Sequence, residues 1–293
     1  MTRVESMLST HLEGTALGGR RLAAVRPSEV QAWVTDRAQV LAPSTLRLLV
    51  GLVRSVFAAA ALDRLIGTSP FGRVSLPRNE QERVVPLMVE QVRALADTVA
   101  PRYEAMVLTQ AGLGLRIGEL LALRQSDVDF LRRTVRVEHQ IAQKTRERIP
   151  PKTPRSRRTV PLPEVVAVAL AEHIAAFPPA ADGLLFHTSN GRPLWQEHYA
   201  SRVFASAVKR AKLPAGTTSH DLRHHYASVL LAAGESVVAV AERLGHENAT
   251  LVLTTYGHLM PDSEDRTRKA IDTAWIAKND RSGEVVTAQG RPQ

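Results

Sequence analysis

Apolar residues recur at helical spacing in two stretches near the start of the chain. In residues 26–41 they follow Pro27 and Ser28, which are common at the start of a helix, at spacings of three and four. A second stripe of the same kind follows Pro43 and ends at the turn-forming sequence GTSP, residues 67–70. The pattern predicts two amphipathic helices that each bury one face, and therefore a small helical domain over residues 1–75.

The remaining pattern predicts a linker, a second domain and a tail. Residues 71–86 have neither a helical nor a strand period and contain two prolines, so we expect a linker at 76–85. Beyond it, helical spacing gives way to alternation in TVRVEHQIA (134–142) and RRTVPL (157–162), and returns from residue 163. We therefore expect a domain over 86–278 that is mainly α with a small antiparallel β-sheet, followed by a disordered tail at 279–293.

Composition excludes several classes of protein. The chain has 293 residues, 44% of them hydrophobic, and contains no cysteine, which rules out disulfides, thiolate zinc sites and cysteine nucleophiles. Apolar runs such as VFAAAAL (56–62) are shorter than a membrane span, and the N-terminus lacks the apolar core of a signal peptide. We expect a cytoplasmic protein with no membrane partner.

The charge points to a polyanionic partner. The formal net charge is +9 and the sequence pI is about 10.4, which favours nucleic acid. Residues 132–158 hold ten Lys and Arg but only two acids, Glu138 and Glu147, on sequence that alternates like a strand. We expect this segment to lie against double-stranded DNA. The candidates for DNA contact are Arg155 and Arg157 in this segment, and Ser44, Thr45, Arg47 and Arg54 in the first domain.

Ionisable residues cluster in HDLRHHYASV, residues 220–229, directly ahead of an apolar helix. Further polar residues stand beside apolar or glycine-rich sequence: Arg116 in GLRIGEL, Lys152 in a basic connection, His246 in LGHEN and Tyr256 in TTYGHL. Each of these alone is more often structural, as a helix-start arginine, a surface lysine or a packed tyrosine. Only the set, in this order, indicates a catalytic site.

Four segments in order, GLRIGEL, KTPRSRRTVPL, HDLRHHYAS and LGHENATLVLTTYGHL, together resemble the tyrosine recombinases, specifically the phage integrase branch. The resemblance covers residues 84–276 and extends more loosely over 20–80. It implies a helical core DNA-binding domain followed by a catalytic domain. It also implies a site-specific recombinase that cuts and rejoins DNA through a 3′-phosphotyrosyl intermediate, without metal, ATP or another cofactor.

The resemblance also assigns roles to residues. The six catalytic candidates are Arg116, Lys152, His220, Arg223, His246 and Tyr256. The two arginines would bind the scissile phosphate, with the histidines adding donors and His220 accepting the phenol proton. Tyr256 would be the nucleophile and Lys152 the general acid. Glu119 lies three residues after Arg116 and would support it structurally. Asp221, His224 and His225 are left without a chemical role.

Three other interpretations compete with this one. His220 and His224 have the i, i+4 spacing of metal ligands, but carboxylate partners are lacking there and Arg223 would repel a dication. A DNA-binding protein that has lost its chemistry would keep the fold without the activity. A type IB topoisomerase would share the chemistry, although the spacing from LGH to TYGHL and the small helical domain resemble the integrases more closely.

The resemblance further implies an assembly. We expect a homotetramer on two DNA attachment sites, docked through an amphipathic helix after residue 258, with a possible excision or directionality factor. Many phage integrases carry an additional N-terminal domain for arm-type sites, and we expect none here. The chain would then be either a recombinase that uses core sites alone or a truncated prophage relic.

Overall fold

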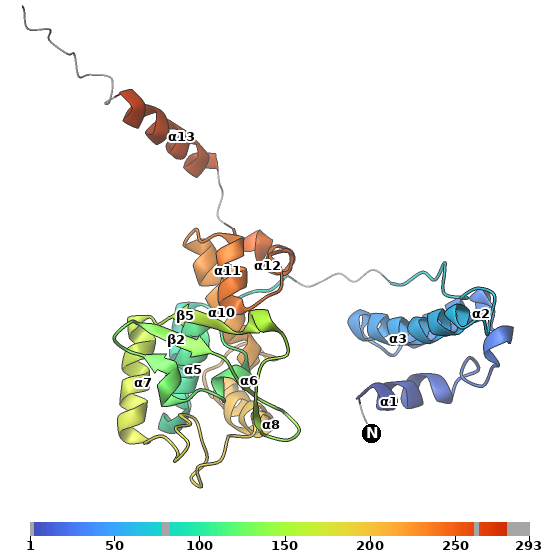
Figure 1. Cartoon of the computed structure of the whole chain (residues 1–293), viewed down its shortest axis with the longest axis horizontal. Coiled ribbons are helices and arrows are strands. Elements are labelled where there is room, and N and C mark those ends of the chain that lie inside the picture. The colour runs from blue at the N-terminus through green and yellow to red at the C-terminus, as the bar shows by residue number, and fades with distance from the viewer. Residues whose placement is uncertain (1–2, 78–82, 261–263, 280–293) are drawn as a thin grey trace, which may run out of the picture. The chain divides into compact units, whose positions relative to one another are not determined.

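The structure is a computed structural model that describes residues 3–77, 83–260 and 264–279 (Figure 1). The contacts divide the chain into two compact units, residues 1–82 and 83–293. Half of the predicted linker and nearly all of the predicted tail lie outside the described residues. Each unit is described separately below.

The first unit is helical, as its apolar spacing predicts. Its elements are α1 (Arg3–Leu8), the π-helical turn η1 (Ser9–Glu13), the 3₁₀ turn η2 (Leu22–Ala24), α2 (Pro27–Ala38) and α3 (Pro43–Leu62). Both longer helices begin at a proline, whose fixed φ and missing N–H suit the first helical position. The core joins Trp33 of α2 to Leu46, Leu49 and Phe57 of α3.

Helix α3 corrects one expectation from the sequence. Within the described residues it is the helix whose length and composition would allow it to cross a membrane, although no apolar run had suggested one. Its stripe of Leu46, Leu49 and Val50 is fully buried in the core of the first unit, whereas Arg47 and Arg54 lie on its exposed side. Packing within this unit therefore accounts for the buried stripe of α3, whereas Leu48, Val56 and Leu62 are exposed.

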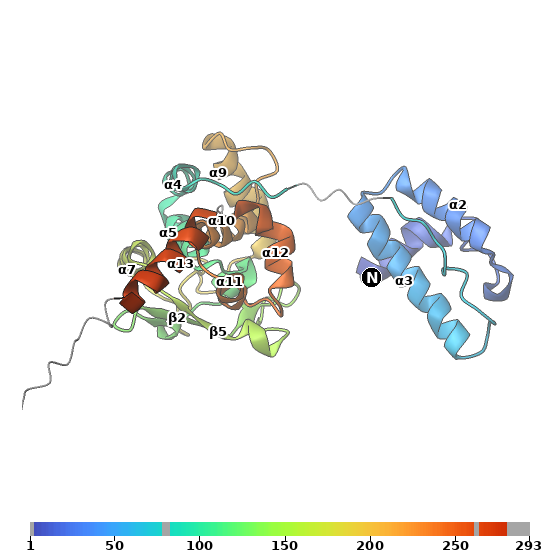
Figure 2. The same ribbon diagram turned by 90° about the horizontal axis from the view of Figure 1, so that it is seen from above.

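The second unit is built of helices around a small sheet. Its first half contains α4 (Val89–Thr98), α5 (Pro101–Leu113), α6 (Ile117–Leu120), η3 (Gln125–Asp127), β1 (Val128–Asp129), β2 (Thr134–Val137), β3 (Gln140–Ile141), β4 (Arg148–Ile149), η4 (Pro154–Ser156), β5 (Arg158–Pro161) and α7 (Glu164–Ala176). Strands β1, β2 and β5 form an antiparallel sheet in which Val128, Val135 and Val160 stand opposite one another, all buried. Helices α5 and α7 lie side by side (Figures 1 and 2).

The remaining elements complete the helical body. They are α8 (Gln196–His198), η5 (Tyr199–Phe204), α9 (Ala205–Arg210), α10 (Ser219–Ala232), α11 (Val237–Leu244), α12 (Thr250–Tyr256), η6 (Gly257–Leu259) and α13 (Glu264–Asn279). One core of buried apolar residues runs from Leu87 through the sheet to Tyr256. The fold is thus mainly α with small antiparallel sheets, which confirms the predicted class.

The alternating stretch 134–142 differs from the prediction of one strand. The structure divides it into β2 and β3, with Glu138 and His139 between them. Strand β3 pairs with β4, which lies in the basic connection where the sequence predicts no strand. The alternation continues through the break because β2 and β3 each bury one face. Their pairing partners differ, since β2 pairs with β5 and β3 pairs with β4.

Candidate active site

The first arginine is placed by a glycine turn at the end of α5. Gly114 has φ +62°, and a Cβ there would lie 2.4 Å from Cδ1 of Tyr226, so the turn needs glycine. Arg116 then precedes α6. Its backbone N–H and its Nη1 each donate to the carboxylate of Glu119 at 2.9 Å, and its Nη2 donates to the carbonyl of Gly245 at 3.3 Å. These hydrogen bonds fix the orientation of the half-exposed guanidinium of Arg116 at the start of α6.

Glu119 is shared between two arginines. Its side chain is 2% exposed, and Arg158 of β5, 6% exposed, donates to both carboxylate oxygens at 3.1 and 2.8 Å. Nε of Arg158 also donates to the carbonyl of Arg243 at 2.7 Å. Burial alone would raise the pKa of Glu119, but the hydrogen bonds and charge of Arg158, with those of Arg116, outweigh it and lower that pKa. The charged carboxylate of Glu119 thus links α6 to β5, and Arg158 extends this contact to the end of α11.

Arg223, the second candidate arginine, is buried between the ends of α5 and α11. It is 1% exposed, and its guanidinium donates to the carbonyls of Gly114 and Leu244 at 2.6 and 2.7 Å. Its Nη2 also lies 2.9 Å from Nε2 of His246. Burial, and then the positive charge of Arg116, lower the pKa of Arg223, which still remains a cation at neutral pH. The second arginine therefore links the ends of α5 and α11 to one of the histidines.

The two candidate histidines are both neutral at pH 7. His220 stands in the first turn of α10, which is capped by Asp221 accepting from N–H and Oγ1 of Thr218 at 2.7 and 2.9 Å. Desolvation, followed by the nearby His224 and Arg223, lowers the pKa of His220 to about 4, although the residue as a whole is exposed. Desolvation and then Arg223 lower the pKa of His246 to about 4 as well.

Tyr256 ends α12 with its side chain inside the protein. The residue is 3% exposed, and its Oη lies 2.5 Å from Nδ1 of His224. Burial raises the pKa of Tyr256 to about 12, with Arg223 acting weakly in the opposite direction. The phenol is therefore protonated and shielded in the absence of DNA.

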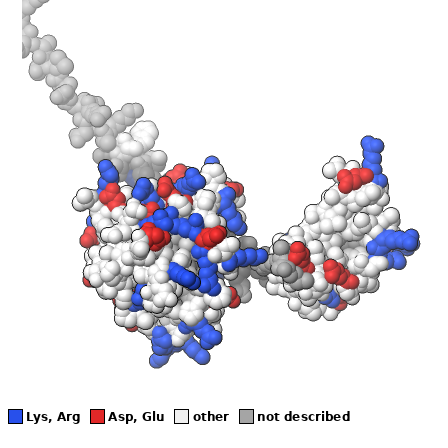
Figure 3. All heavy atoms as spheres, turned by 60° about the horizontal axis from the view of Figure 1, so that its bottom comes forward, with Lys and Arg blue, Asp and Glu red and all other residues white. Residues whose placement is uncertain are grey.

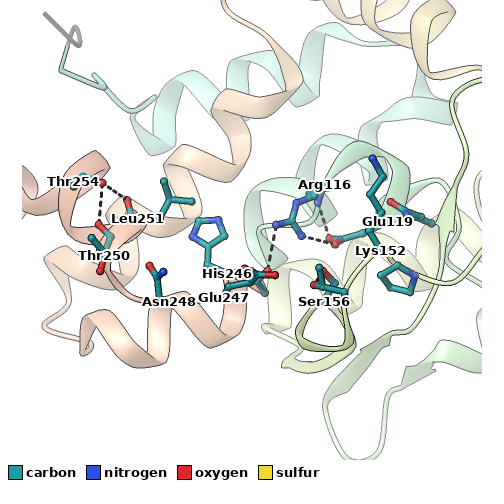
Figure 4. Close-up of a pocket in the computed structure, with 14 residues that line it drawn as sticks. Arg116, Glu119, Lys152, Ser156, His246, Glu247, Asn248, Thr250, Leu251 and Thr254 are labelled. Carbon is teal, nitrogen blue, oxygen red and sulfur yellow. Dashed lines mark hydrogen bonds and ion pairs between the residues drawn. The ribbon is translucent and has the colours of Figure 1, made fainter. Parts of the chain in front are cut away.

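An open cavity of about 800 Å³ brings part of the predicted set together (Figure 4). Arg116, Lys152 and Ser156 lie on one side of it, and His246 faces them from the other side, next to α12. Arg223 reaches this cavity only through its contact with His246, while His220 and Tyr256 do not line it. Three of the six candidates thus surround one space large enough for a phosphate group.

The predicted DNA-contact residues lie on the two units separately. Arg155 in η4 and Arg157 directly after it are exposed, and Nη1 of Arg155 donates to the carbonyl of Glu247. In the first unit, Nη2 of Arg47 donates to the carbonyl of Pro77 at 2.6 Å, Arg54 and Ser44 are exposed, and Thr45 is half-buried. Their contacts with DNA stay predictions.

Sequence reasoning missed Arg158 and the role of His224. Arg158 stands two positions before the buried Val160 on β5, so the alternation of that strand already turned its side chain inward. A basic residue on the buried side of a strand needs a carboxylate, and Glu119 was available. The contact of His224 with Tyr256 spans 32 positions and has no local signal.

The metal-site interpretation has no support in the geometry. His220 and His224 contact each other edge to face, with ring centroids 4.7 Å apart. Over the part of the chain that the structure describes, no three His, Asp or Glu side chains are grouped as metal ligands would be. The charged side chains that line the cavity are instead Arg116 and Lys152, with Glu119 and Glu247.

Replacing Arg158 by methionine is expected to lower the free energy of unfolding by about 3–5 kcal/mol, because Glu119 would be left as a buried carboxylate without its two-point partner. The double variant Arg158→Met, Glu119→Leu should recover most of that loss, since both buried charges are removed. Urea unfolding of the single and double variants checks this.

The matched control is the exposed pair of Arg132 and Asp129, whose arginine side chain is 85% exposed. Arg132→Met should leave the free energy of unfolding unchanged within error. Equal stability of Arg158→Met and the wild type would contradict the interpretation that the buried ion pair of Arg158 and Glu119 stabilises the fold.

The histidine pKa values predict a loss of stability as pH falls from 7 to 5. His220 and His246 have a folded-state pKa of about 4, below the unfolded value of 6.5, so between these values the unfolded chain binds protons that the folded chain does not. Stability is therefore highest above pH 6.5 and falls below it. Urea unfolding at pH 7 and pH 5 should show a smaller difference for the variant His220→Asn, His246→Asn than for the wild type, and an equal difference would refute the assignment.

Comparison with known proteins identifies the family. Residues 82–262 match the model of the phage integrase family. A XerC-like tyrosine recombinase from Caldanaerobacter subterraneus subsp. tengcongensis is 24% identical over 94% of this chain and 78% of its own length. Tyrosine recombinase XerC of Methylobacterium sp. strain 4-46 is 32% identical over 77% of this chain and 71% of its own length. The Tn1549 transposon integrase in complex with a circular intermediate DNA has a TM-score of 0.79 at 25% identity, over 92% of each chain.

Together, the fold and these similarities define a DNA breaking and rejoining enzyme. The chain belongs to the phage integrase family. It is a tyrosine-type site-specific recombinase that acts on DNA, as the four motifs had indicated, which confirms the predicted family and activity.

Proposed function

We propose that the cavity lined by Arg116, Lys152 and His246 binds the scissile phosphate and that Tyr256 attacks it. The Oη of Tyr256 forms a bond to phosphorus, the bond to the 5′ oxygen of the next nucleotide breaks, and a 3′-phosphotyrosyl link remains. The phenol proton passes to His220, and Lys152 gives a proton to the departing 5′ oxygen. Attack by the 5′-hydroxyl of another strand reverses the step and joins the two DNAs.

The observation that carries this proposal is the open cavity that Arg116, Lys152 and His246 line together, with Arg223 in contact with His246. A phosphodiester repels nucleophiles because it is anionic, and charge redistributes over its oxygens in the transition state. Arg116 is held by Glu119 before any substrate arrives, and Arg223 is fixed by two backbone carbonyls. The donors therefore need little reorganisation. Because the phosphotyrosyl bond conserves the energy of the cut bond, the chemistry needs neither metal nor ATP.

The DNA-binding surface is proposed from the distribution of basic residues. Lys and Arg side chains are numerous on the face of the second unit seen in Figure 3, with acidic residues among them. Arg155 lies in η4 and Arg157 directly follows it, while Ser44, Thr45 and Arg47 lie at the start of α3 and Arg54 lies further along that helix. We assign the helical domain 1–75 to core-site DNA and the domain 86–278 to catalysis. Affinity should fall steeply with salt.

The assembly is proposed from α13. Its Ile271 and Trp275 are 56% and 72% exposed, which is unusual for large apolar side chains on one helix. We propose that this helix docks on a neighbouring copy in a homotetramer on two attachment sites, and that a directionality factor can bias the reaction. Since the substrate is DNA, we also place the protein in the cytoplasm.

The test is to trap the covalent intermediate. The protein is incubated with a library of duplex DNA in the presence of a metal chelator and denatured in SDS, and DNA that remains attached is recovered. We expect an adduct whose nucleotide maps to Tyr256 by mass spectrometry and whose free strand end carries a 5′-hydroxyl. DNA binding in a gel shift without any adduct would favour the binding-only interpretation and overturn the proposal.

A further inference from the structure

The proposed nucleophile does not lie where the phosphate would bind. Leu251 and Thr254 of α12 line the cavity, whereas Tyr256 does not. At 100° per residue, Tyr256 stands about 200° around the helix from Thr254, on the inner side that it shares with the fully buried Val252. The side chain of Tyr256 thus leaves α12 on the side away from Thr254, and attack on a phosphate in the cavity requires its hydroxyl to leave His224.

A single side chain of α10 meets the tyrosine hydroxyl there. Nδ1 of His224 lies 2.5 Å from Oη of Tyr256, and the two rings meet at a steep angle with centroids 5.5 Å apart. His224 is half-buried and also contacts His220, one helical turn earlier. A buried phenol needs a hydrogen-bond partner, and within the described structure His224 provides it.

The chain around Tyr256 is anchored independently of this bond. Nε2 of His258 lies 3.0 Å from the carbonyl of Val84, and Nδ1 of His225 lies 2.7 Å from the carbonyl of Leu87. The backbone after the tyrosine and the neighbouring turn of α10 are therefore fixed by other contacts. The hydrogen bond to His224 acts on the tyrosine side chain itself, so its loss should change the position of that side chain without unfolding the segment.

We propose that His224 is a positioning residue that retains the hydroxyl of Tyr256 against α10 in the DNA-free protein, so that the tyrosine reaches the phosphate only after this hydrogen bond breaks. The inference rests on the proposed role of Tyr256 as nucleophile. A neutral hydrogen bond of ordinary strength shifts an equilibrium roughly 2- to 10-fold, which is the change in tyrosine exposure expected from its removal.

The experiment measures the reactivity of Tyr256 without DNA. Wild type, His224→Leu and His224→Asn are treated with tetranitromethane, and nitration of each tyrosine is followed over time by mass spectrometry. Leucine fills a similar volume but forms no hydrogen bond, whereas the amide of asparagine can replace Nδ1. We expect Tyr256 to be nitrated roughly 2- to 10-fold faster in His224→Leu and at the wild-type rate in His224→Asn. Unchanged nitration in His224→Leu, or equal acceleration in both variants, would overturn the proposal.

Two other tyrosines serve as internal references. Tyr103 is half-buried and should react similarly in all three proteins, whereas Tyr199, 1% exposed, should stay unreactive. If Tyr199 also becomes reactive, the leucine variant is misfolded, and His224→Phe, which keeps a ring against Tyr256, is judged by the same criterion. Because no DNA is present, the result does not depend on covalent cleavage, so failure here is distinct from failure of the adduct test.

Discussion

Replacing Tyr256 by phenylalanine is expected to abolish covalent attachment to DNA, a loss of about 10⁴-fold or more in cleavage rate, while DNA affinity stays at the wild-type level. The change removes one oxygen atom from a buried ring and leaves the cations around the cavity in place. Stability should change little, by about 1 kcal/mol, because a single hydrogen bond to His224 is lost. Adduct formation in SDS gels, gel shifts at one fixed salt concentration and urea unfolding measure the three quantities.

The matched control is Tyr103→Phe, which removes the same atom from a half-buried tyrosine outside the cavity. It should form adducts at the wild-type rate. Adducts that persist in Tyr256→Phe and vanish in Tyr103→Phe would show that the nucleophile has been wrongly assigned.

The second large effect is expected at Arg223. Methionine at this position should reduce cleavage by about 10³-fold or more and lower the free energy of unfolding by about 2–4 kcal/mol. The carbonyls of Gly114 and Leu244 would each lose a charged donor in a buried place. Arg223→Lys keeps the charge, but one ammonium group cannot reproduce the planar fork that reaches both carbonyls and His246, so its cleavage should also fall, by about 10²-fold.

Single-turnover cleavage of a fixed duplex and urea unfolding measure these effects. Arg132→Lys and Arg132→Met, at a side chain that is 85% exposed, provide the matched control and should cleave normally. If Arg223→Lys cleaved at the wild-type rate, the fork geometry described for Arg223 would be irrelevant to catalysis.

The helical parts of the fold follow from the sequence because burial sets their period. The stripe of α3 that was expected to face inward is buried at Leu46, Leu49 and Val53, whereas Val56, which was expected on the same stripe, is 48% exposed. The sheet was less predictable, since residues 134–142 alternate throughout while β2 pairs with β5 and β3 pairs with β4. The choice of partner depends on distant residues, which a local period does not encode.

The site shows the same division between local and distant information. Three of the residues that the motifs had singled out, Arg116, Lys152 and His246, lie around one cavity. The side chains that hold the motifs were harder to infer, because Arg158 reaches a carboxylate 39 positions earlier and His224 meets a tyrosine 32 positions later. Candidate catalytic residues can be recognised from their residue types and motif order. Residues that support them through distant contacts, such as Arg158 and His224, can be recognised only once the fold is known.

Helix α10, which contains the segment HDLRHHYAS, joins several parts of this site. Within 14 residues it carries Arg223 to the ends of α5 and α11, His224 to Tyr256, and His225 to the backbone at Leu87. A local opening of this helix would release the arginine and the tyrosine together. The rate of amide hydrogen exchange in α10 should therefore report on the contacts of Arg223, His224 and His225 together. A variant that opens this helix should loosen all three contacts at once.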